Sequence, residues 1–330
     1  MTVINGIEID NISYIKNEIK EAIINNEPIE ENLHVIIVIS NPCQYAKRYI
    51  LAREFIKRFD TEQNIILYIV ELCFSDKQQF CVTEKNNPKH LQIRTNTEPL
   101  WHKENMINIG VKQLLPKTWK AFAWIDADIE FESASWALDT LKVLNGCRDI
   151  IQLFSHCSDM DKNEDPMRIF QSFGFQYSKN KKYNSSGLNF WHPGFAWAIT
   201  KKAYDKIGGI FDKSILGSGD HNIALSLIGN GIQSVNNEIS DNYKKSILNY
   251  EKKIFGLRLG YIPGVIRHYF HGSKENRKYS ERWKILVKHQ YDPENHVKYD
   301  KNGLLIPTDK CPKELLNDIY QYFYERNEDE

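Results

Sequence analysis

The sequence predicts an α/β protein with a mostly parallel central sheet flanked by helices. Residues 33–40 (LHVIIVIS) and 64–72 (NIILYIVEL) are almost continuously apolar over the length of a strand. Strands that are covered on both faces have this composition. Apolar residues at helical spacing follow the first strand, over residues 45–59. Strand and helix patterns then alternate along the chain, which is typical of parallel strands joined by helical crossovers.

The remaining elements of the first half follow in order. An amphipathic helix is expected within residues 1–32, after a short strand or loop. Residues 90–95 (HLQIRT) are expected to form a third strand, and residues 103–115 a helix. Residues 121–131 (AFAWIDADIEF) are expected to form a fourth strand with charged residues at its end. This strand would place polar side chains at the edge of the sheet.

The second half is less regular. Residues 158–187 are polar and lysine-rich with little periodicity, which predicts a long loop or lid over the site. Residues 189–200 return to strand character, and residues 203–229 are expected to form a helix, a glycine turn, a loop and a second helix. Helices over residues 281–289 and 314–324 complete the chain.

Composition excludes some classes of function. Lys+Arg and Asp+Glu both number 43, so the net charge is zero and nucleic acid is not expected as the main partner. The longest apolar runs are too short to cross a bilayer, so no membrane span is expected. The N-terminus lacks a signal-peptide core, and six scattered cysteines without a CxxC pair are typical of reduced thiols. A cytoplasmic protein is therefore expected.

Two acidic residues mark the end of the fourth strand. Asp126 and Asp128 are one residue apart, so their carboxylates lie on the same side of an extended backbone. Two adjacent carboxylates are unfavourable without a cation, and oxygen ligands suit Mn²⁺ or Mg²⁺. Such an ion would bind phosphate oxygens. The alternative is a solvated strand end. The position at the exit of a buried strand, where α/β folds bind ligands, favours a site.

The IDAD sequence ending at Asp128 resembles the DxD motif of GT-A glycosyltransferases. The segment WHKENMINIG, which begins at Trp101, is similar to a helix start in β-1,4-galactosyltransferases. The resemblance implies that Asp126 contacts ribose and metal, that Asp128 ligates the metal, and that Trp101 and Lys103 contact the nucleotide. A cation at a helix start suits phosphate. The alternative is an aromatic core anchor beside a surface lysine.

A glycine-rich acidic turn follows. The sequence GSGDH places Asp220 and His221 at the start of an apolar helix, where Asp220 is either a helix N-cap or a functional acid. Together with the GFAWA segment that begins at Gly194, the turn resembles family-2-like and galactosyltransferase GT-A enzymes. The resemblance implies that Gly194 lies in the donor site and that Asp220 accepts the proton of the acceptor hydroxyl. The family turn has two or more acids, so His221 remains a substitute candidate.

The segment VIRHYFHGSKENR concentrates imidazoles and cations. GT-A enzymes often take a further metal ligand from such a C-terminal histidine, so the resemblance implies His268 or His271 in that role. Lys274 or Arg277 would hold the β-phosphate. The alternative is a basic surface loop with one core histidine.

Strand ends supply weaker candidates. Ser40 and Asn41 end the first strand, where GT-A folds contact the nucleoside, and Glu71 ends the second, where an acid often contacts uracil or ribose. Turn formation or solvation explains these residues equally well.

The order of the motifs indicates a metal-dependent GT-A glycosyltransferase, and the resemblance covers roughly residues 33–275. We expect a helical extension over residues 1–32, a catalytic domain over 33–275 and a C-terminal helical extension over 276–330 packed on it. The expected reaction transfers a sugar from a nucleotide-diphosphate sugar, with UDP favoured, to a hydroxyl of a glycan or glycoprotein, with inversion. The composition suggests a large DNA virus or phage, and hence the host cytoplasm or the virion.

Two alternatives remain. One is a non-catalytic nucleotide- or glycan-binding module of the same fold. The other is a nucleotidyltransferase, which would have a glycine-rich, basic loop after the first strand, where this chain has Ser-Asn-Pro-Cys.

Overall fold

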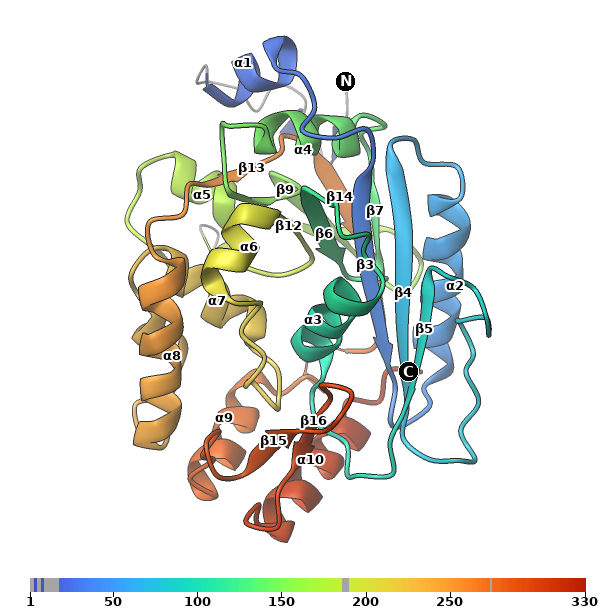
Figure 1. The fold of residues 1–330 in the computed structure, drawn as a ribbon, viewed down its shortest axis with the longest axis vertical. Coiled ribbons are helices and arrows are strands. Elements are labelled where there is room, and N and C mark those ends of the chain that lie inside the picture. Colours follow the sequence, from blue (N-terminus) through green and yellow to red (C-terminus); the bar gives the residue numbers. More distant parts are fainter. Residues whose placement is uncertain (1–2, 5–6, 9–17, 186–189, 274) are drawn as a thin grey trace.

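The computed structural model describes residues 3–4, 7–8, 18–185, 190–273 and 275–330. A seven-stranded sheet forms its centre, with helices on both faces (Figure 1). Its strands, in spatial order, are β13 (Leu259–Tyr261), β8 (Ile150–Gln152), β12 (Ala196–Thr200), β6 (Ala121–Ile125), β3 (Leu33–Ser40), β4 (Ile65–Cys73) and β5 (His90–Arg94). Neighbouring strands are parallel except at β12, which runs antiparallel to both β6 and β8. The predicted fold class, a mostly parallel α/β sheet flanked by helices, is confirmed.

Apolar side chains on both faces of β3 explain why its sequence is continuously apolar. Ile36 belongs to one core cluster, while its neighbours Val35 and Ile37 belong to the cluster on the opposite face. Successive residues of a strand point to opposite faces, so a strand between two cores needs apolar residues throughout. The helices that contribute to the first core are α3 (Lys103–Gln113), α6 (Lys201–Ile207), α7 (Gly219–Leu227), α8 (Asp241–Ile254), α9 (Tyr279–Lys288) and α10 (Lys313–Glu325), together with Phe173 at the start of α5. The helices that contribute to the second are α1 (Glu18–Asn25), α2 (Ala46–Phe59), α4 (Trp136–Leu144) and α5 (Phe173–Ser178).

The predicted fourth strand over residues 121–131 divides into two strands in different sheets. A turn at residues 127–128 separates β6 from β7 (Ile129–Phe131). The second sheet has the spatial order β11 (Trp191–His192), β10 (Pro166–Ser172), β9 (His156–Met160), β14 (Val265–His268) and β7. The expectation that Asp126 and Asp128 share one side of an extended strand is therefore wrong. The backbone turns between them because each flanking strand pairs with a different sheet.

The predicted loop over residues 158–187 is also corrected. Most of it is ordered structure, namely the end of β9, then β10 and α5. The polar residues Ser158 and Asp159 lie on β9 and are buried. This strand pairs with β10 on one side and with β14 on the other. Their polarity masked the strand signal, because the sequence pattern for a strand depends on apolar alternation. Residues 186–189 of the predicted lid lie outside the described residues.

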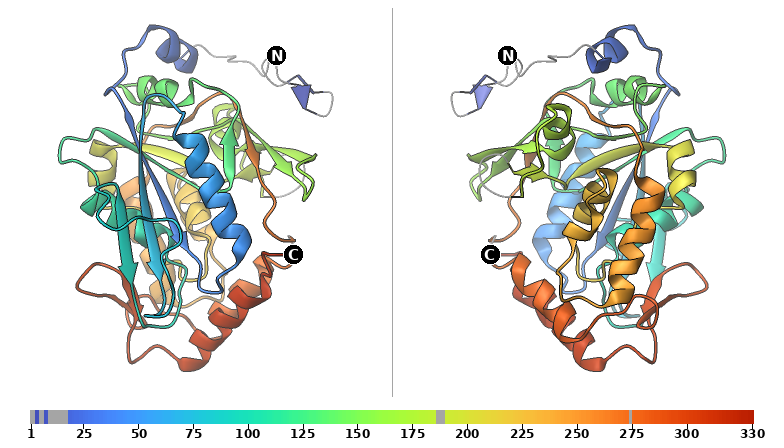
Figure 2. Two further views of the ribbon diagram at one scale, coloured as in Figure 1. Left: turned by 90° about the vertical axis from the view of Figure 1, so that its right-hand side faces the viewer. Right: turned by 90° about the vertical axis from the view of Figure 1, so that its left-hand side faces the viewer.

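The C-terminal part lies beyond the carboxyl ends of β3 and β4 (Figures 1 and 2). Its helices α9 and α10, which pack on each other, match the helices expected over residues 281–289 and 314–324. The elements of this part are α9 (Tyr279–Lys288), β15 (Val297–Tyr299), β16 (Leu305–Pro307) and α10 (Lys313–Glu325). Short elements elsewhere are β1 (Val3–Ile4), β2 (Ile7–Glu8) and the 3-10 helix η2 (Gly231–Ser234).

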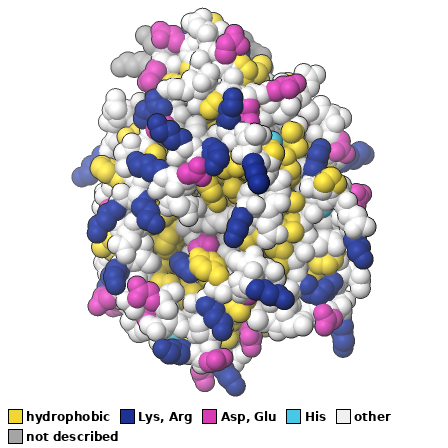
Figure 3. Space-filling view, viewed as in Figure 1, with side chains coloured by type: hydrophobic (Ala, Val, Ile, Leu, Met, Phe, Trp, Pro, Cys, Tyr) yellow, Lys and Arg dark blue, Asp and Glu magenta, His cyan; other side chains and the backbone are white. Residues whose placement is uncertain are grey.

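The state of the cysteines and the distribution of surface charge bear on the expectations from composition. All six cysteines lie in the described part of the chain and are free thiols, as expected. Basic and acidic side chains are interspersed over the face that Figure 3 shows. Among the residues that the structure describes, no helix combines the length and the apolar character needed to cross a bilayer.

Candidate active site

A cavity of about 710 Å³ lies at the carboxyl ends of β3 and β6 and brings most of the predicted site residues together. The predicted residues that line it are Ser40, Asn41, Trp101, Lys103, Asp126, Asp128, Gly194, Asp220, His221, His268 and His271. Glu71 is not part of this lining, and Lys274 lies outside the described residues. The site therefore forms where ligands bind in open α/β sheets.

Three side chains on one wall are arranged as metal ligands. One ligand atom from each of Asp128, His268 and His271 lies within 4.8 Å of the others. His271 Nε2 is 3.0 Å and His268 Nε2 is 3.9 Å from Asp128 Oδ2. The pairing of β7 with β14 sets this geometry, because His268 is directly opposite Ile129. Both histidines that the sequence offered as alternatives thus belong to one cluster.

The chemistry of this cluster fits a hard divalent cation. Asp128 Oδ1 is buried and has no hydrogen-bond partner among the described residues. A buried carboxylate oxygen without a partner is costly, and a cation would satisfy it. Adjacent ligands of an octahedral ion with bonds of about 2.1 Å lie about 3 Å apart. The 3.0 Å between His271 Nε2 and Asp128 Oδ2 matches that spacing.

Electrostatics keep Asp128 and His268 in their metal-binding forms. Burial by itself raises the pKa of Asp128, but His271, His268 and the Arg277 guanidinium outweigh burial and lower this pKa. Burial lowers the pKa of His268, although its hydrogen bond to Asp159 acts in the opposite direction. At neutral pH the cluster therefore combines an ionised carboxylate with a neutral His268 imidazole, the forms that bind metals.

Asp126 has a different partner from Asp128. Its Oδ1 forms an ion pair with Lys103 Nζ, at the first residue of α3, and it is not part of the three-residue cluster. Burial raises the pKa of Asp126, and the Lys103 ammonium only partly offsets this effect. Burial lowers the pKa of Lys103, but Asp126, Asp220 and Glu104 together outweigh burial and raise it. Lys103 therefore remains a cation at the helix start, where an anion would bind favourably.

Glu104 is a carboxylate of the site that sequence reasoning missed. It is buried, lines the cavity and packs so closely on Gly219 that a Cβ there would lie 2.3 Å from its carboxyl group. Burial raises the pKa of Glu104 to about 8, partly offset by Lys103 and reinforced by Asp220. The glycine of the acidic turn is thus required by close approach. The only sequence signal for Glu104 was its position next to Lys103.

Asp220 and His221 lie in the first turn of α7, and both face the cavity. The His221 backbone N–H donates to Asp220 Oδ1 at 2.8 Å, while a Cβ at Gly194 would lie 2.9 Å from Oδ2. His221 Nε2 is 3.1 Å from the Tyr183 hydroxyl, and burial lowers the pKa of His221. Gly194 thus permits the close approach of Asp220, and the two candidate bases lie side by side in the chain.

The strand-end candidates have structural partners. The Asn41 amide donates to the Tyr45 carbonyl at 2.9 Å, and Asn41 Oδ1 accepts from the Tyr45 N–H at 3.0 Å, which locks the turn before α2. Glu71 accepts backbone hydrogen bonds from Cys81 at 2.7 Å and Thr83 at 2.8 Å, and one from the Thr83 hydroxyl at 2.6 Å. These bonds fix the loop that follows β4.

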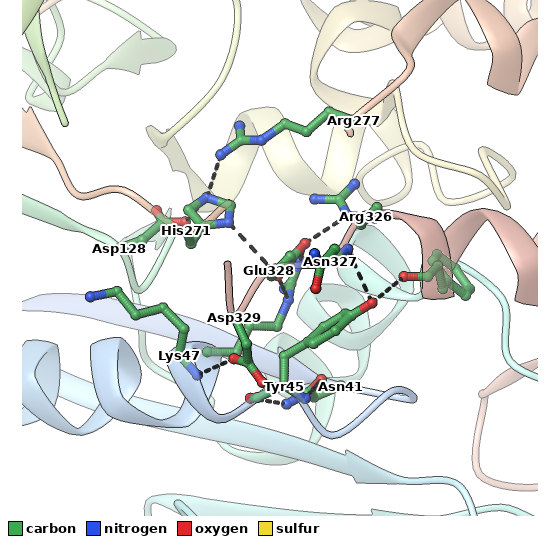
Figure 4. A network of polar contacts seen from close by, with 12 residues as sticks. Asn41, Tyr45, Lys47, Asp128, His271, Arg277, Arg326, Asn327, Glu328 and Asp329 are labelled. Atoms are coloured by element: carbon green, nitrogen blue, oxygen red, sulfur yellow. Dashed lines mark hydrogen bonds and ion pairs between the residues drawn. The ribbon is translucent and has the colours of Figure 1, made fainter. Parts of the chain in front are cut away.

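The C-terminal tail, residues 326–330, reaches the cluster and was not anticipated (Figure 4). Glu328 is 1% exposed and accepts hydrogen bonds from Arg48 Nη2 at 2.7 Å and Arg326 Nε at 2.6 Å. The Arg326 guanidinium also lies over the Trp101 ring, 5.3 Å from its centroid. The sequence RNEDE is polar throughout and has no motif, so only the tertiary contacts reveal its place.

Aromatic rings line another part of the cavity. His192 stacks on Phe170 and on Phe195, with ring centroids 4.5 Å apart in each pair. Burial lowers the pKa of His192 to about 3, so its ring is neutral. Flat apolar ring faces of this kind pack well against the apolar faces of ligands.

The sequence matches no protein-family model and no curated protein. Solved structures with similar folds include a mannosyltransferase from Pyrobaculum calidifontis in complex with GDP-Man and Mn²⁺. The identity is 11%, the match covers 93% of this chain and 75% of that chain, and the TM-score is 0.45. Another is a variant of Drosophila β-1,4-galactosyltransferase 7 with manganese, UDP-Gal and xylobiose, at 10% identity, 86% and 97% coverage and a TM-score of 0.37. Since both scores are below 0.5, the function must be argued from the geometry of the site.

Proposed function

We propose that this protein is a metal-dependent glycosyltransferase of the GT-A type. It would transfer a sugar from a nucleotide-diphosphate sugar, with UDP favoured, to a hydroxyl of a glycan or glycoprotein acceptor. The observation that supports this most strongly is the cluster of Asp128, His268 and His271 in the same cavity as Asp220. A divalent ion and a carboxylate base facing one cavity are the two components that such a transfer needs.

A divalent cation, Mn²⁺ or Mg²⁺, held by Asp128, His268 and His271 would neutralise the charge that develops on the departing diphosphate. Lys103 lies at the start of α3 and adds a fixed positive charge to the same cavity. The nucleoside would lie near Ser40, Asn41 and Trp101, which line the cavity at the ends of β3 and before α3.

Asp220 is the proposed base. The acceptor hydroxyl oxygen bonds to the anomeric carbon as its proton passes to the Asp220 carboxylate, and the bond from that carbon to the β-phosphate oxygen breaks. The nucleoside diphosphate leaves, and attack from the opposite side inverts the anomeric centre. His221 is the alternative base, since burial keeps its imidazole neutral at pH 7.

The aromatic rings of Phe170, His192 and Phe195 are suited to the acceptor. They line the cavity that Asp220 faces, and the apolar face of a sugar ring can pack on them. This arrangement supports a glycan acceptor.

Thermal unfolding with Mn²⁺ and UDP, GDP, CDP or dTDP tests the proposal, in wild type and Asp128→Ala. A metal-dependent rise in Tm with one nucleotide, absent in the variant, is expected and would identify the donor class. No shift with any nucleotide would contradict the proposal.

Incubation with the matching nucleotide sugar separates the alternatives. Transfer, or slow hydrolysis without acceptor, supports the glycosyltransferase. Tight binding without turnover would instead indicate a binding module, and formation of a nucleotide–phosphate bond from a nucleoside triphosphate would indicate a nucleotidyltransferase.

A further inference from the structure

The two histidines of the cluster share an orientation that the metal site alone does not explain. Each ring directs Nε2 toward Asp128 Oδ2, at 3.9 Å for His268 and 3.0 Å for His271. Each ring directs its other nitrogen toward a buried carboxylate. His268 Nδ1 is 2.8 Å from Asp159 Oδ1, and His271 Nδ1 is 3.7 Å from Glu328 Oε2 (Figure 4 shows the second pair).

Hydrogen-bond chemistry determines which nitrogen carries the proton in His271. Arg277 Nη2 lies 2.8 Å from His271 Nε2, and a guanidinium can only donate. A proton on Nε2 could point toward Asp128 but would then face the Arg277 donor. His271 Nε2 is therefore the lone-pair nitrogen, and Nδ1, which faces Glu328, carries the hydrogen. In His268 the Asp159 carboxylate is an acceptor at 2.8 Å, so Nδ1 is the donor there as well.

Both carboxylates are held rigidly. Asp159 is 2% exposed on β9, directly opposite His268 on the parallel strand β14, and Arg168 Nε donates to its other oxygen at 2.9 Å. Glu328 is fixed by Arg48 and Arg326. A Cβ at Gly272, next to His271, would lie 3.0 Å from Glu328 Cα, so the tail packs directly against the ligand segment.

We propose that Asp159 and Glu328 are positioning residues for the metal site. Asp159 accepts the Nδ1 hydrogen of His268 at 2.8 Å, while Glu328 attracts that of His271 electrostatically from 3.7 Å, beyond hydrogen-bond distance. Each carboxylate thereby favours the ring orientation in which the Nε2 lone pair is directed toward the cation. Carboxylates that orient metal-bound histidines in this way typically change metal affinity about 10–100-fold. The inference rests on the proposed function, because it concerns the same metal site. It makes Glu328, near the C-terminus, part of that site.

Mn²⁺ affinity measures the effect directly. The free Mn²⁺ signal in electron paramagnetic resonance gives Kd for wild type, Asp159→Ala and Glu328→Ala with Mn²⁺ alone. Each alanine variant is expected to bind Mn²⁺ about 10–100-fold more weakly. Asp159→Asn keeps an acceptor oxygen, so it should recover most of the affinity.

Two controls separate positioning from general disturbance. Asp329→Asn weakens the caps that Asp329 provides to the Ala46 and Lys47 N–H groups, at 3.0 and 2.8 Å, and should leave Mn²⁺ affinity unchanged. Glu132→Gln removes a carboxylate that pairs with Arg267, the neighbour of His268, and should also have no effect. Equal losses in the controls would overturn the proposal.

The histidine tautomers provide a readout that loss of packing would not mimic. Long-range ¹H–¹⁵N correlation spectra of ¹⁵N-histidine protein, assigned with His268→Gln and His271→Gln, should show Nδ1–H for both rings in wild type. Asp159→Ala should shift only His268 toward Nε2–H, whereas Asp159→Asn, which keeps an acceptor oxygen, should leave His268 as Nδ1–H. Wild-type rings with Nε2–H, or alanine variants with unchanged tautomer and Mn²⁺ affinity, would overturn the positioning role.

The same Mn²⁺ measurement distinguishes failure of the metal site from failure of the positioning role. If wild type binds no Mn²⁺, the metal site is wrong and both proposals fall. If wild type binds Mn²⁺ and the Asp159 and Glu328 variants bind it equally well, only the positioning role falls.

Discussion

Asp126 and Asp128 are one residue apart, yet they have different neighbours and contribute to different walls of the cavity. Asp126 lies on what we term the lysine wall, which consists of Lys103, Glu104, Asp126 and Asp220. Asp128 lies on the histidine wall, which consists of Asp128, His268 and His271. Burial raises the pKa of both aspartates, but the net direction is upward for Asp126 and downward for Asp128.

The difference shows that neighbours from other elements determine what a carboxylate does. Asp126 has one cation beside it and further carboxylates nearby, so burial prevails. Asp128 has two imidazoles and a guanidinium beside it, and these prevail over burial. The histidine wall is therefore suited to a cation, and the lysine wall to substrate anions and proton transfer. The predictions below test this division, in order of decreasing effect.

Asp220→Asn should impair chemistry alone. Removal of the proposed base is expected to lower kcat by about 10²–10⁴-fold, since general-base catalysis contributes that much. Mn²⁺ affinity should stay at the wild-type value, because Asp220 lies outside the histidine wall. Steady-state transfer kinetics with a Mn²⁺ titration check both. Wild-type turnover in Asp220→Asn would exclude Asp220 as the base. If His221→Asn then showed the loss of kcat, His221 would be the base instead.

Asp128→Asn should impair metal binding and chemistry together. A bound cation contributes several kcal/mol of charge stabilisation, so kcat/KM is expected to fall about 10²–10³-fold. The Mn²⁺-dependent rise in Tm should also disappear. Asp126→Asn is the matched comparison, and it should retain measurable Mn²⁺ binding without nucleotide. If the two variants lose Mn²⁺ equally, the separation of the walls is wrong.

Glu104→Gln tests whether burial raises the pKa of this residue of the lysine wall, through the pH dependence of stability. The pKa of Glu104 is raised from 4.5 to about 8, so between these values the folded state holds a proton that the unfolded state releases. Stability therefore falls as pH rises through this window. The Gln variant cannot ionise and should lose less stability between pH 5 and 8. Thermal unfolding should show a difference of about 2–4 °C for each kcal/mol removed. Identical pH profiles would contradict the raised pKa.

Glu71→Gln should affect folding but neither wall. Replacing the carboxylate weakens four hydrogen bonds to the loop after β4, with an expected loss of about 1–3 kcal/mol in the free energy of unfolding. Denaturant unfolding measures it. Nucleotide affinity should be unchanged, and a weaker affinity would instead support the contact with the nucleoside expected from the sequence.

Much of the fold was predictable because it depends on local pattern. The runs that became β3 and β4 are almost continuously apolar, and the helical spacing that follows β3 is what a covered parallel sheet requires. The strand β9 was missed because its buried residues, including Ser158 and Asp159, are polar. Of these two residues, Asp159 lines the cavity and pairs with His268, so a strand that contributes to a polar site lacks the usual signal of a core strand.

The sequence by itself determined the α/β class, the position of the acidic pair at a strand end and the set of histidines within reach. Those properties follow from periodicity and from the chemistry of residue types. Tertiary structure alone decided that the chain turns at Ala127, that Asp126 meets Lys103 and that Asp128 meets the histidines. It alone brought Glu328, almost at the end of the chain, beside His271. Contacts between residues far apart in sequence depend on how strands and helices pack, and no local pattern encodes them.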